Sequence, residues 1–228
     1  MDIISFITRI RHEVDQKTAF IFMKKYTAMI IALLGWFAII TQFVLMMENR
    51  TTFVTEAIVR FFSFFTILTN LLVAIYFSLQ FLGSGNKGVL FRSGALTAIT
   101  VYITVVGLVY QIALRHIWNP TGMQMIVDEL LHTIIPVIAI LFWLKYEEKE
   151  KLQWNKIPGY LLYPLIYLIY ILMRGTFSGF YPYPFIDVLQ LGWSAVIVNI
   201  LLLILVFLIL FGLFVGVGKI LTKYMPKN

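Results

Sequence analysis

Three titratable side chains lie close together in the stretch DELLHTIIP at residues 128–136, namely Asp128, Glu129 and His132. Both carboxylates fall on the same helical face as the imidazole, because Asp128 precedes it by four residues and Glu129 by three. A carboxylate that accepts a hydrogen bond from one ring nitrogen leaves the other free to act as a base. Pro136, one turn later, can bend the helix. The stretch is either a base site or an ordinary helix start whose acids favour the helix dipole.

A base needs a nucleophile, and hydroxyl groups occur in the apolar stretch FFSFFTILTNLLVAIYF at 61–77. At 1.5 Å per helical residue, Thr69 would lie about 12 Å below the start of this span and His132 about 9 Å below the start of its own. Two antiparallel helices would therefore bring these side chains face to face. The alternatives are that Thr69 bonds the carbonyl four residues earlier and that Asn70 holds helices together.

The composition is that of a polytopic membrane protein. Of 228 residues, 61% are hydrophobic and 13% charged, and the mean hydropathy is +0.90. The chain has no cysteine, which excludes disulfides, thiolate metal sites and a thiol nucleophile. We expect neither a metal nor a cofactor. The net charge of +7 is attributed to topology and to anionic lipid head groups, and nucleic acid is not an expected partner.

A bilayer core of about 30 Å requires roughly 20 apolar residues per helical crossing. Six stretches meet this requirement and predict an all-α fold with a single transmembrane domain over 26–216. The basic leader, 1–25, is expected to form a short helix on the membrane surface or a solvated segment, and the first span to be retained rather than cleaved. A basic tail covers 217–228. The predicted spans are approximately 26–47, 61–82, 94–114, 126–144, 157–174 and 189–216.

The cations divide unevenly between the two sides of these spans. Every lysine falls in the leader, the second connection, the fourth connection or the tail, so these segments and both termini are predicted to be cytoplasmic. The cations of the other side are all arginines: Arg50, Arg60, Arg115 and Arg174. Because a guanidinium binds a carboxylate through two hydrogen bonds, Arg115 and Arg174 are candidates for holding an anionic substrate group. The alternative is that each one snorkels at a helix end. Tyr181 and Tyr183, on the same side, are interpreted as interfacial aromatics.

At this point the chain resembles a six-helix membrane family typified by the androgen-induced protein and the androgen-dependent tissue-factor-pathway-inhibitor-regulating protein (ADTRP). The resemblance rests on TILTN at 66–70, which matches an LT step on an early helix, and on HTIIP at 132–136, which matches a later HTxxP. It implies a membrane threonine hydrolase with Thr69 as nucleophile and His132 as base. Members of that type hydrolyse esters that join fatty acids to hydroxy fatty acids.

The family's animal proteins often carry a second histidine where this chain has Glu129, and the chain is more similar to a bacterial branch. We therefore expect an integral protein of a bacterial cell membrane, with its site toward the outer leaflet and a lipid ester within the bilayer as substrate. Asp128 or Glu129 would orient the imidazole, and Asn70 would support the site. Oxyanion donors are not identified, and no oligomeric state is predicted.

Other functions remain open at this stage. The polar cluster could bind a lipid or a partner without catalysis. An intramembrane protease would need a serine in a glycine-flanked turn opposite a histidine, and RSGAL at 92–96 is a poor match on the predicted inner side. A transporter is disfavoured because the two halves show no repeat with paired broken helices. Loss of active-site labelling on replacing the base separates the hydrolase from the binding protein.

Overall fold

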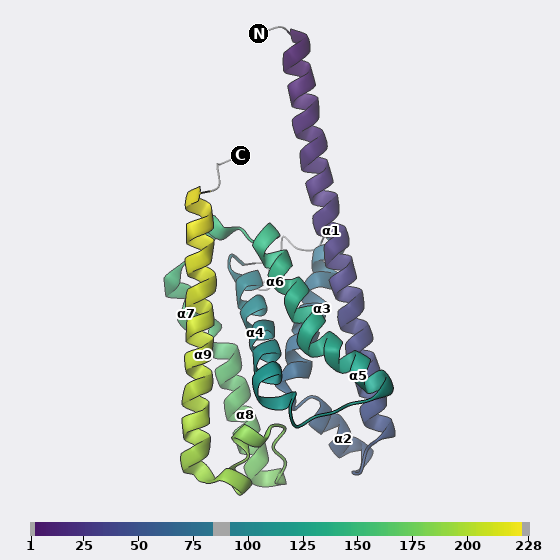
Figure 1. The fold of residues 1–228 in the computed structure, drawn as a ribbon, viewed down its shortest axis with the longest axis vertical. Helices are drawn as coiled ribbons and strands as arrows, with labels where there is room; N and C mark the ends of the chain where they lie inside the picture. The colour runs from purple at the N-terminus through teal and green to yellow at the C-terminus, as the bar shows by residue number, and fades with distance from the viewer. Residues whose placement is uncertain (1–2, 84–91, 225–228) are drawn as a thin grey trace.

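The computed structural model describes residues 3–83 and 92–224, and its regular elements are all helical over these residues. Six helices are long and apolar enough to cross a membrane, as expected for an integral membrane protein. This confirms the all-α class and the predicted number of membrane-length helices. The first turns of α1 (Ile3–Glu48) and the last turns of α9 (Val188–Tyr224) lie at the same end of the bundle (Figure 1). The predicted inner-side cations Lys87 and Lys227 lie outside the described residues.

The first and last helices are longer than the predicted spans. α1 is continuous, so the described part of the leader forms its first turns and extends beyond the bundle, with no separate surface helix (Figure 1). α9 continues through the described part of the tail to Tyr224. Near its start α9 is interrupted at Gly192, whose φ of 74° and ψ of 161° are readily adopted only by glycine.

The second span is divided into two helices. A short helix, α2 (Val54–Phe61), is followed by a turn over 62–64 and then by α3 (Phe65–Leu82). The membrane-length helix therefore begins at Phe65, whereas the prediction began it at residue 61. Because of this later start, Thr66 lies in the first turn of the helix, and Thr69 is four residues from its start rather than eight.

α4 (Ala95–Val109) is the central helix and packs against α3, α6 (Ile135–Tyr146) and α9. Its side chains are buried almost throughout, in keeping with that position. It ends in a π-helical turn, η2 (Tyr110–Leu114).

The remaining elements surround α4. The fourth span is formed by α5 (Gly122–Glu129), a π-helical turn η3 (Leu130–Ile134) and α6. α8 (Leu162–Ser178) lies on the outside of the bundle, with most of its residues exposed. The loop after α8 returns across the end of the bundle that contains α2 (Figure 1). Three short elements connect α6 to α8, namely η4 (Lys149–Lys151), η5 (Trp154–Lys156) and α7 (Ile157–Tyr160). The loop after α8 contains η6 (Pro184–Ile186).

Candidate functional site

Thr66 lies in the first turn of α3, where the backbone leaves hydrogen-bonding groups free. The preceding Phe64 is extended, with φ −83° and ψ 125°, and the helix begins at Phe65. The N–H groups of a first turn have no acceptor within their own helix. The Thr66 N–H donates instead to the Tyr183 hydroxyl at 3.2 Å, and this hydroxyl also lies 3.3 Å from Thr66 Oγ1. Thr66 is only 8% exposed, so the turn holds a hydroxyl inside the protein.

His132 faces Thr66 from η3. Its Nε2 lies 3.4 Å from Thr66 Oγ1, and its Nδ1 lies 3.0 Å from the main-chain oxygen of Asp128. A carbonyl oxygen can only accept a hydrogen bond, so in a neutral imidazole Nδ1 carries the proton and Nε2 keeps its lone pair. The Asp128 carboxylate stabilises this form, because its Oδ1 lies 3.4 Å from Nδ1. The nitrogen directed at the Thr66 hydroxyl is therefore the basic one.

The imidazole and Thr66 are fixed relative to each other by two further side chains. The Tyr110 ring stacks on the His132 ring, with 4.1 Å between centroids and 15° between planes. The Asn70 amide nitrogen donates to the main-chain oxygens of Thr66, at 2.9 Å, and Leu131, at 3.3 Å. Asn70 is fully buried and thus joins the first turn of α3 to η3.

The π-helical turn that carries His132 lies immediately before Pro136. In an α-helix the N–H of residue 136 would donate to the His132 oxygen, but proline has none. The helix is wider here, and the Ile135 N–H donates to the oxygen of Leu130, five residues earlier. π-Helical turns are frequent at functional sites. α4 comes so close at Gly107 that a Cβ there would lie 3.0 Å from the His132 oxygen.

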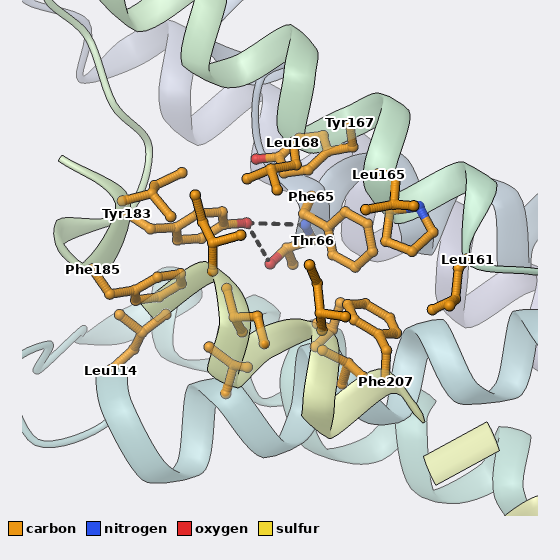
Figure 2. Close-up of a pocket in the computed structure, with 18 of the residues that line it drawn as sticks. Phe65, Thr66, Leu114, Leu161, Leu165, Tyr167, Leu168, Tyr183, Phe185 and Phe207 are labelled. Carbon is orange, nitrogen blue, oxygen red and sulfur yellow. Dashed lines mark hydrogen bonds between the residues drawn. The ribbon is translucent and has the colours of Figure 1, made fainter. Parts of the chain in front are cut away.

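Two cavities meet at these residues. A narrow apolar cavity of about 90 Å³ lies between α3, α4, α8 and α9, and Figure 2 shows Thr66 and Tyr183 among its lining. A larger cavity of about 890 Å³ lies toward α2 and the segment after η2, and Gln42, Arg60 and Asp128 contribute polar groups to its lining. Thr66, His132 and Tyr183 line both cavities. The junction can therefore hold a molecule with one apolar and one more polar part.

The structure separates the residues that the sequence grouped together. The hydroxyl beside His132 belongs to Thr66, and Thr69 Oγ1 lies instead 3.2 Å from the Tyr163 hydroxyl. No hydrogen bond joins Thr69 to His132 among the described residues. Of the two carboxylates, Asp128 contacts the imidazole. Glu129 accepts hydrogen bonds from Thr133 at 2.8 Å and from Arg115 at 2.5 Å.

The two arginines expected to bind a substrate anion are both paired within the protein. Arg115 donates to Glu129 and Gln111. Arg174 donates to Glu56 at 2.7 Å, and Arg60 donates to the same oxygen at 2.8 Å.

Neither Arg115 nor Arg174 is among the residues that line the large cavity, which include Arg50 and Arg60. The hydrogen bond from Arg60 is the main cause that lowers the pKa of Glu56 below its usual 4.5, and Arg174 adds to the effect. Glu56 is therefore held as a charged link between α2 and α8.

Sequence reasoning missed Thr66 and Tyr183. Thr66, Thr69 and Asn70 share one face of α3, and choosing between the threonines requires the residue at which the helix begins. Tyr183 was interpreted as an interfacial aromatic, because nothing local in YPYPF at 181–185 shows that the loop returns to α3.

Other candidate sites receive no support from the described residues. Ser93, of the RSGAL stretch, precedes the first turn of α4 and donates to the Lys151 oxygen, whereas His132 lies beside Gly107 near the other end of that helix. No group of three histidine, aspartate or glutamate side chains suitable for a metal ion occurs in residues 3–83 and 92–224. No protein-family model, curated protein or solved structure matches the chain.

Proposed function

We propose that the chain is an integral membrane hydrolase of lipid esters, with Thr66 as nucleophile and His132 as general base. The observation that carries the proposal is that His132 Nε2 lies 3.4 Å from a buried threonine hydroxyl, where an apolar and a polar cavity meet, while its Nδ1 faces the Asp128 main-chain oxygen. A threonine hydroxyl is a weak nucleophile until a base takes its proton. The 3.4 Å separation is that of a resting site and would shorten when substrate binds. The motif resemblance to threonine hydrolases supports the same reaction class.

The reaction proceeds through an acyl-threonine. Thr66 Oγ1 bonds to the ester carbonyl carbon, its proton moves to His132 Nε2, and the carbonyl π electrons become a lone pair on oxygen. Collapse of this intermediate breaks the bond to the alcohol, which leaves with the proton from Nε2. Water then attacks the acyl carbon and gives a proton to Nε2. The second collapse breaks the bond to Oγ1, returns the proton to it and releases the fatty acid.

The two cavities support a placement for the ester in this proposal. The acyl chain occupies the apolar cavity, which is bordered by Leu165 of α8 and Ile204 of α9, and a longer chain passes between these helices into the bilayer. The alcohol part occupies the larger cavity, whose lining includes Arg50, Arg60 and Gln42. A fatty acid ester of a hydroxy fatty acid fits this division, since its alcohol part ends in a carboxylate that a guanidinium can bind.

Replacing His132 tests the proposal directly. In full-length protein purified in detergent, His132→Ala should lower the rate of labelling by a long-chain alkyl fluorophosphonate by about 10²- to 10⁴-fold, the usual contribution of a general base. His116→Ala is the matched control, because His116 is exposed and is not among the residues that line either cavity. The rate of hydrolysis of a p-nitrophenyl acyl ester should likewise fall in His132→Ala and stay at the wild-type level in His116→Ala. Equal labelling of His132→Ala and wild type would favour a lipid-binding protein without catalysis.

The chain is further proposed to lie in the bacterial cell membrane with both termini cytoplasmic, which places the site toward the outer leaflet. The described lysines lie on the leader, the connection after α6 and the end of α9, whereas the arginines near the site lie at the opposite end. The chain has no cysteine, so single cysteines can report the orientation. A membrane-impermeant maleimide should label Thr51→Cys on intact cells and Gln153→Cys only after lysis. The reverse pattern would invert the topology.

A further inference from the structure

We propose that Tyr183 is a catalytic residue whose hydroxyl donates a hydrogen bond to the oxyanion formed when Thr66 attacks an ester. This inference rests on the proposed hydrolase and assigns the donor that its two tetrahedral intermediates require. The negative oxygen of such an intermediate needs a hydrogen-bond donor close to the nucleophile. Tyr183 meets this condition, because its hydroxyl lies 3.3 Å from Thr66 Oγ1 and 3.2 Å from the Thr66 nitrogen (Figure 2).

The hydroxyl can change its acceptor without a movement of the ring. In the resting site it accepts from the Thr66 N–H, and its own proton can be directed at Thr66 Oγ1. When Oγ1 bonds to the substrate, the former carbonyl oxygen shares a carbon with it and carries the charge. Rotation about the tyrosine C–O bond directs the proton to that oxygen, and no covalent bond to Tyr183 forms or breaks. The Thr66 N–H, at the positive end of the α3 dipole, favours the same charge.

The Tyr183 ring is held in place before substrate binds. It stacks on Phe185, with centroids 5.2 Å apart and planes at 6°, and meets the Phe64 ring edge-on at 5.9 Å. Burial raises the pKa of the Tyr183 phenol above its usual 10.0, so the hydroxyl keeps its proton under physiological conditions. A donor fixed in this way requires no reorganisation when the charge develops.

The other polar groups near Thr66 are occupied in different ways. The Asn70 amide nitrogen donates to two main-chain oxygens. His132 holds its Nδ1 proton on Asp128 and uses Nε2 for the Thr66 proton. Arg60 Nε is bonded to Glu56. Tyr183 is thus the side-chain donor best placed to serve the oxyanion.

Tyr183→Phe tests this assignment, because it removes one oxygen and keeps the ring. We expect kcat for a p-nitrophenyl acyl ester to fall about 10²- to 10³-fold, as when one oxyanion donor is removed from other acyl-transfer enzymes. Acylation and deacylation both form an oxyanion, so kcat falls whichever step limits it. KM should change by less than about threefold, because the ester ground state carries no such charge. The melting temperature in detergent should fall by only several degrees, because the Thr66 N–H loses its acceptor, and kcat is measured well below the melting transition.

Tyr181→Phe is the matched control, since Tyr181 lies in the same loop and its ring packs on Gly175 rather than on Thr66. The proposal fails if Tyr183→Phe keeps half or more of the wild-type kcat, if Tyr181→Phe loses as much, or if activity falls only in step with the folded fraction. Thr66→Ala separates this failure from that of the hydrolase itself. An inactive Thr66→Ala beside a fully active Tyr183→Phe overturns only the role of Tyr183, whereas a fully active Thr66→Ala overturns the hydrolase.

Discussion

Thr66→Ala should lower kcat/KM for a p-nitrophenyl acyl ester by at least about 10³-fold, because the oxygen that forms the acyl intermediate is removed. Fluorophosphonate labelling, followed by the mass of the intact protein, should disappear as well. The fold should persist, since Asn70 bonds the main-chain oxygen of Thr66 and the Tyr183 hydroxyl accepts from its N–H. Thr66→Ser keeps a hydroxyl at this position and should retain measurable labelling, which distinguishes loss of the nucleophile from loss of packing.

Thr69→Ala is the decisive comparison for the nucleophile. Thr69 is fully buried and its Oγ1 lies 3.2 Å from the Tyr163 hydroxyl, so its removal should reduce stability by about 1–3 kcal/mol but leave labelling within about fivefold of wild type. The opposite pattern, with Thr66→Ala active and Thr69→Ala inactive, would favour the dyad implied by the motif resemblance. That dyad would require Thr69 to approach His132 in a conformation different from this one.

The position of the nucleophile depends on a helix start that the sequence conceals. The residues FFSFF at 61–65 contain neither proline nor glycine, so nothing in them marks the turn between α2 and α3. A depth counted from residue 61 places Thr69 opposite His132. With α3 beginning at Phe65, Thr66 is the threonine in the first turn, and it takes the position beside the imidazole.

Local patterns predicted other features correctly. The apolar lengths predicted six membrane-length helices, and Pro136 predicted an irregularity near His132, which the structure shows as η3. The spacing of the acids placed both on the histidine's side of the helix. Because the π-helical turn is wider and Arg115 hydrogen-bonds to Glu129, Asp128 is the carboxylate that contacts the imidazole. These two effects depend on tertiary packing, and a count of helical residues does not contain them.

The partners of the polar residues around the site likewise depend on tertiary contacts rather than on local patterns. The residue type of Arg174 suggested that it binds a substrate anion, but its guanidinium donates to Glu56 on α2. The sequence did not indicate this pair, because the two residues are far apart in the chain. Tyr183 gave no local signal, because the loop after α8 brings its hydroxyl to the first turn of α3 only in the folded chain. Residue types therefore indicated which side chains could take part in chemistry, and tertiary contacts determined which of them lie together.

Gly107→Leu should lower the fluorophosphonate labelling rate by about 10²-fold, although residue 107 is not among those that line the two cavities. A Cβ at this position would lie 3.0 Å from the His132 oxygen and 3.3 Å from Pro136 Cβ. The His132 oxygen belongs to η3 and Pro136 to the start of α6, which follows it directly, so the larger side chain must push this part of the helix away from α4. Nε2 would then move relative to Thr66 Oγ1, and a displacement of about 1 Å is enough for a loss of this size.

Gly107→Ala should lower the labelling rate by a smaller factor, since the neighbouring atoms need to move by only a few tenths of an ångström to accommodate a Cβ. Overpacking should also reduce the free energy of unfolding by about 1–3 kcal/mol, measured by thermal denaturation in detergent. Gly216→Ala is the matched control, because its Cβ would meet Trp154 at an ordinary 3.7 Å. Alanine favours a helix over glycine by up to about 1 kcal/mol, so this variant should be as active as wild type and no less stable. Normal labelling and stability in Gly107→Leu would show that α4 does not set the position of the base.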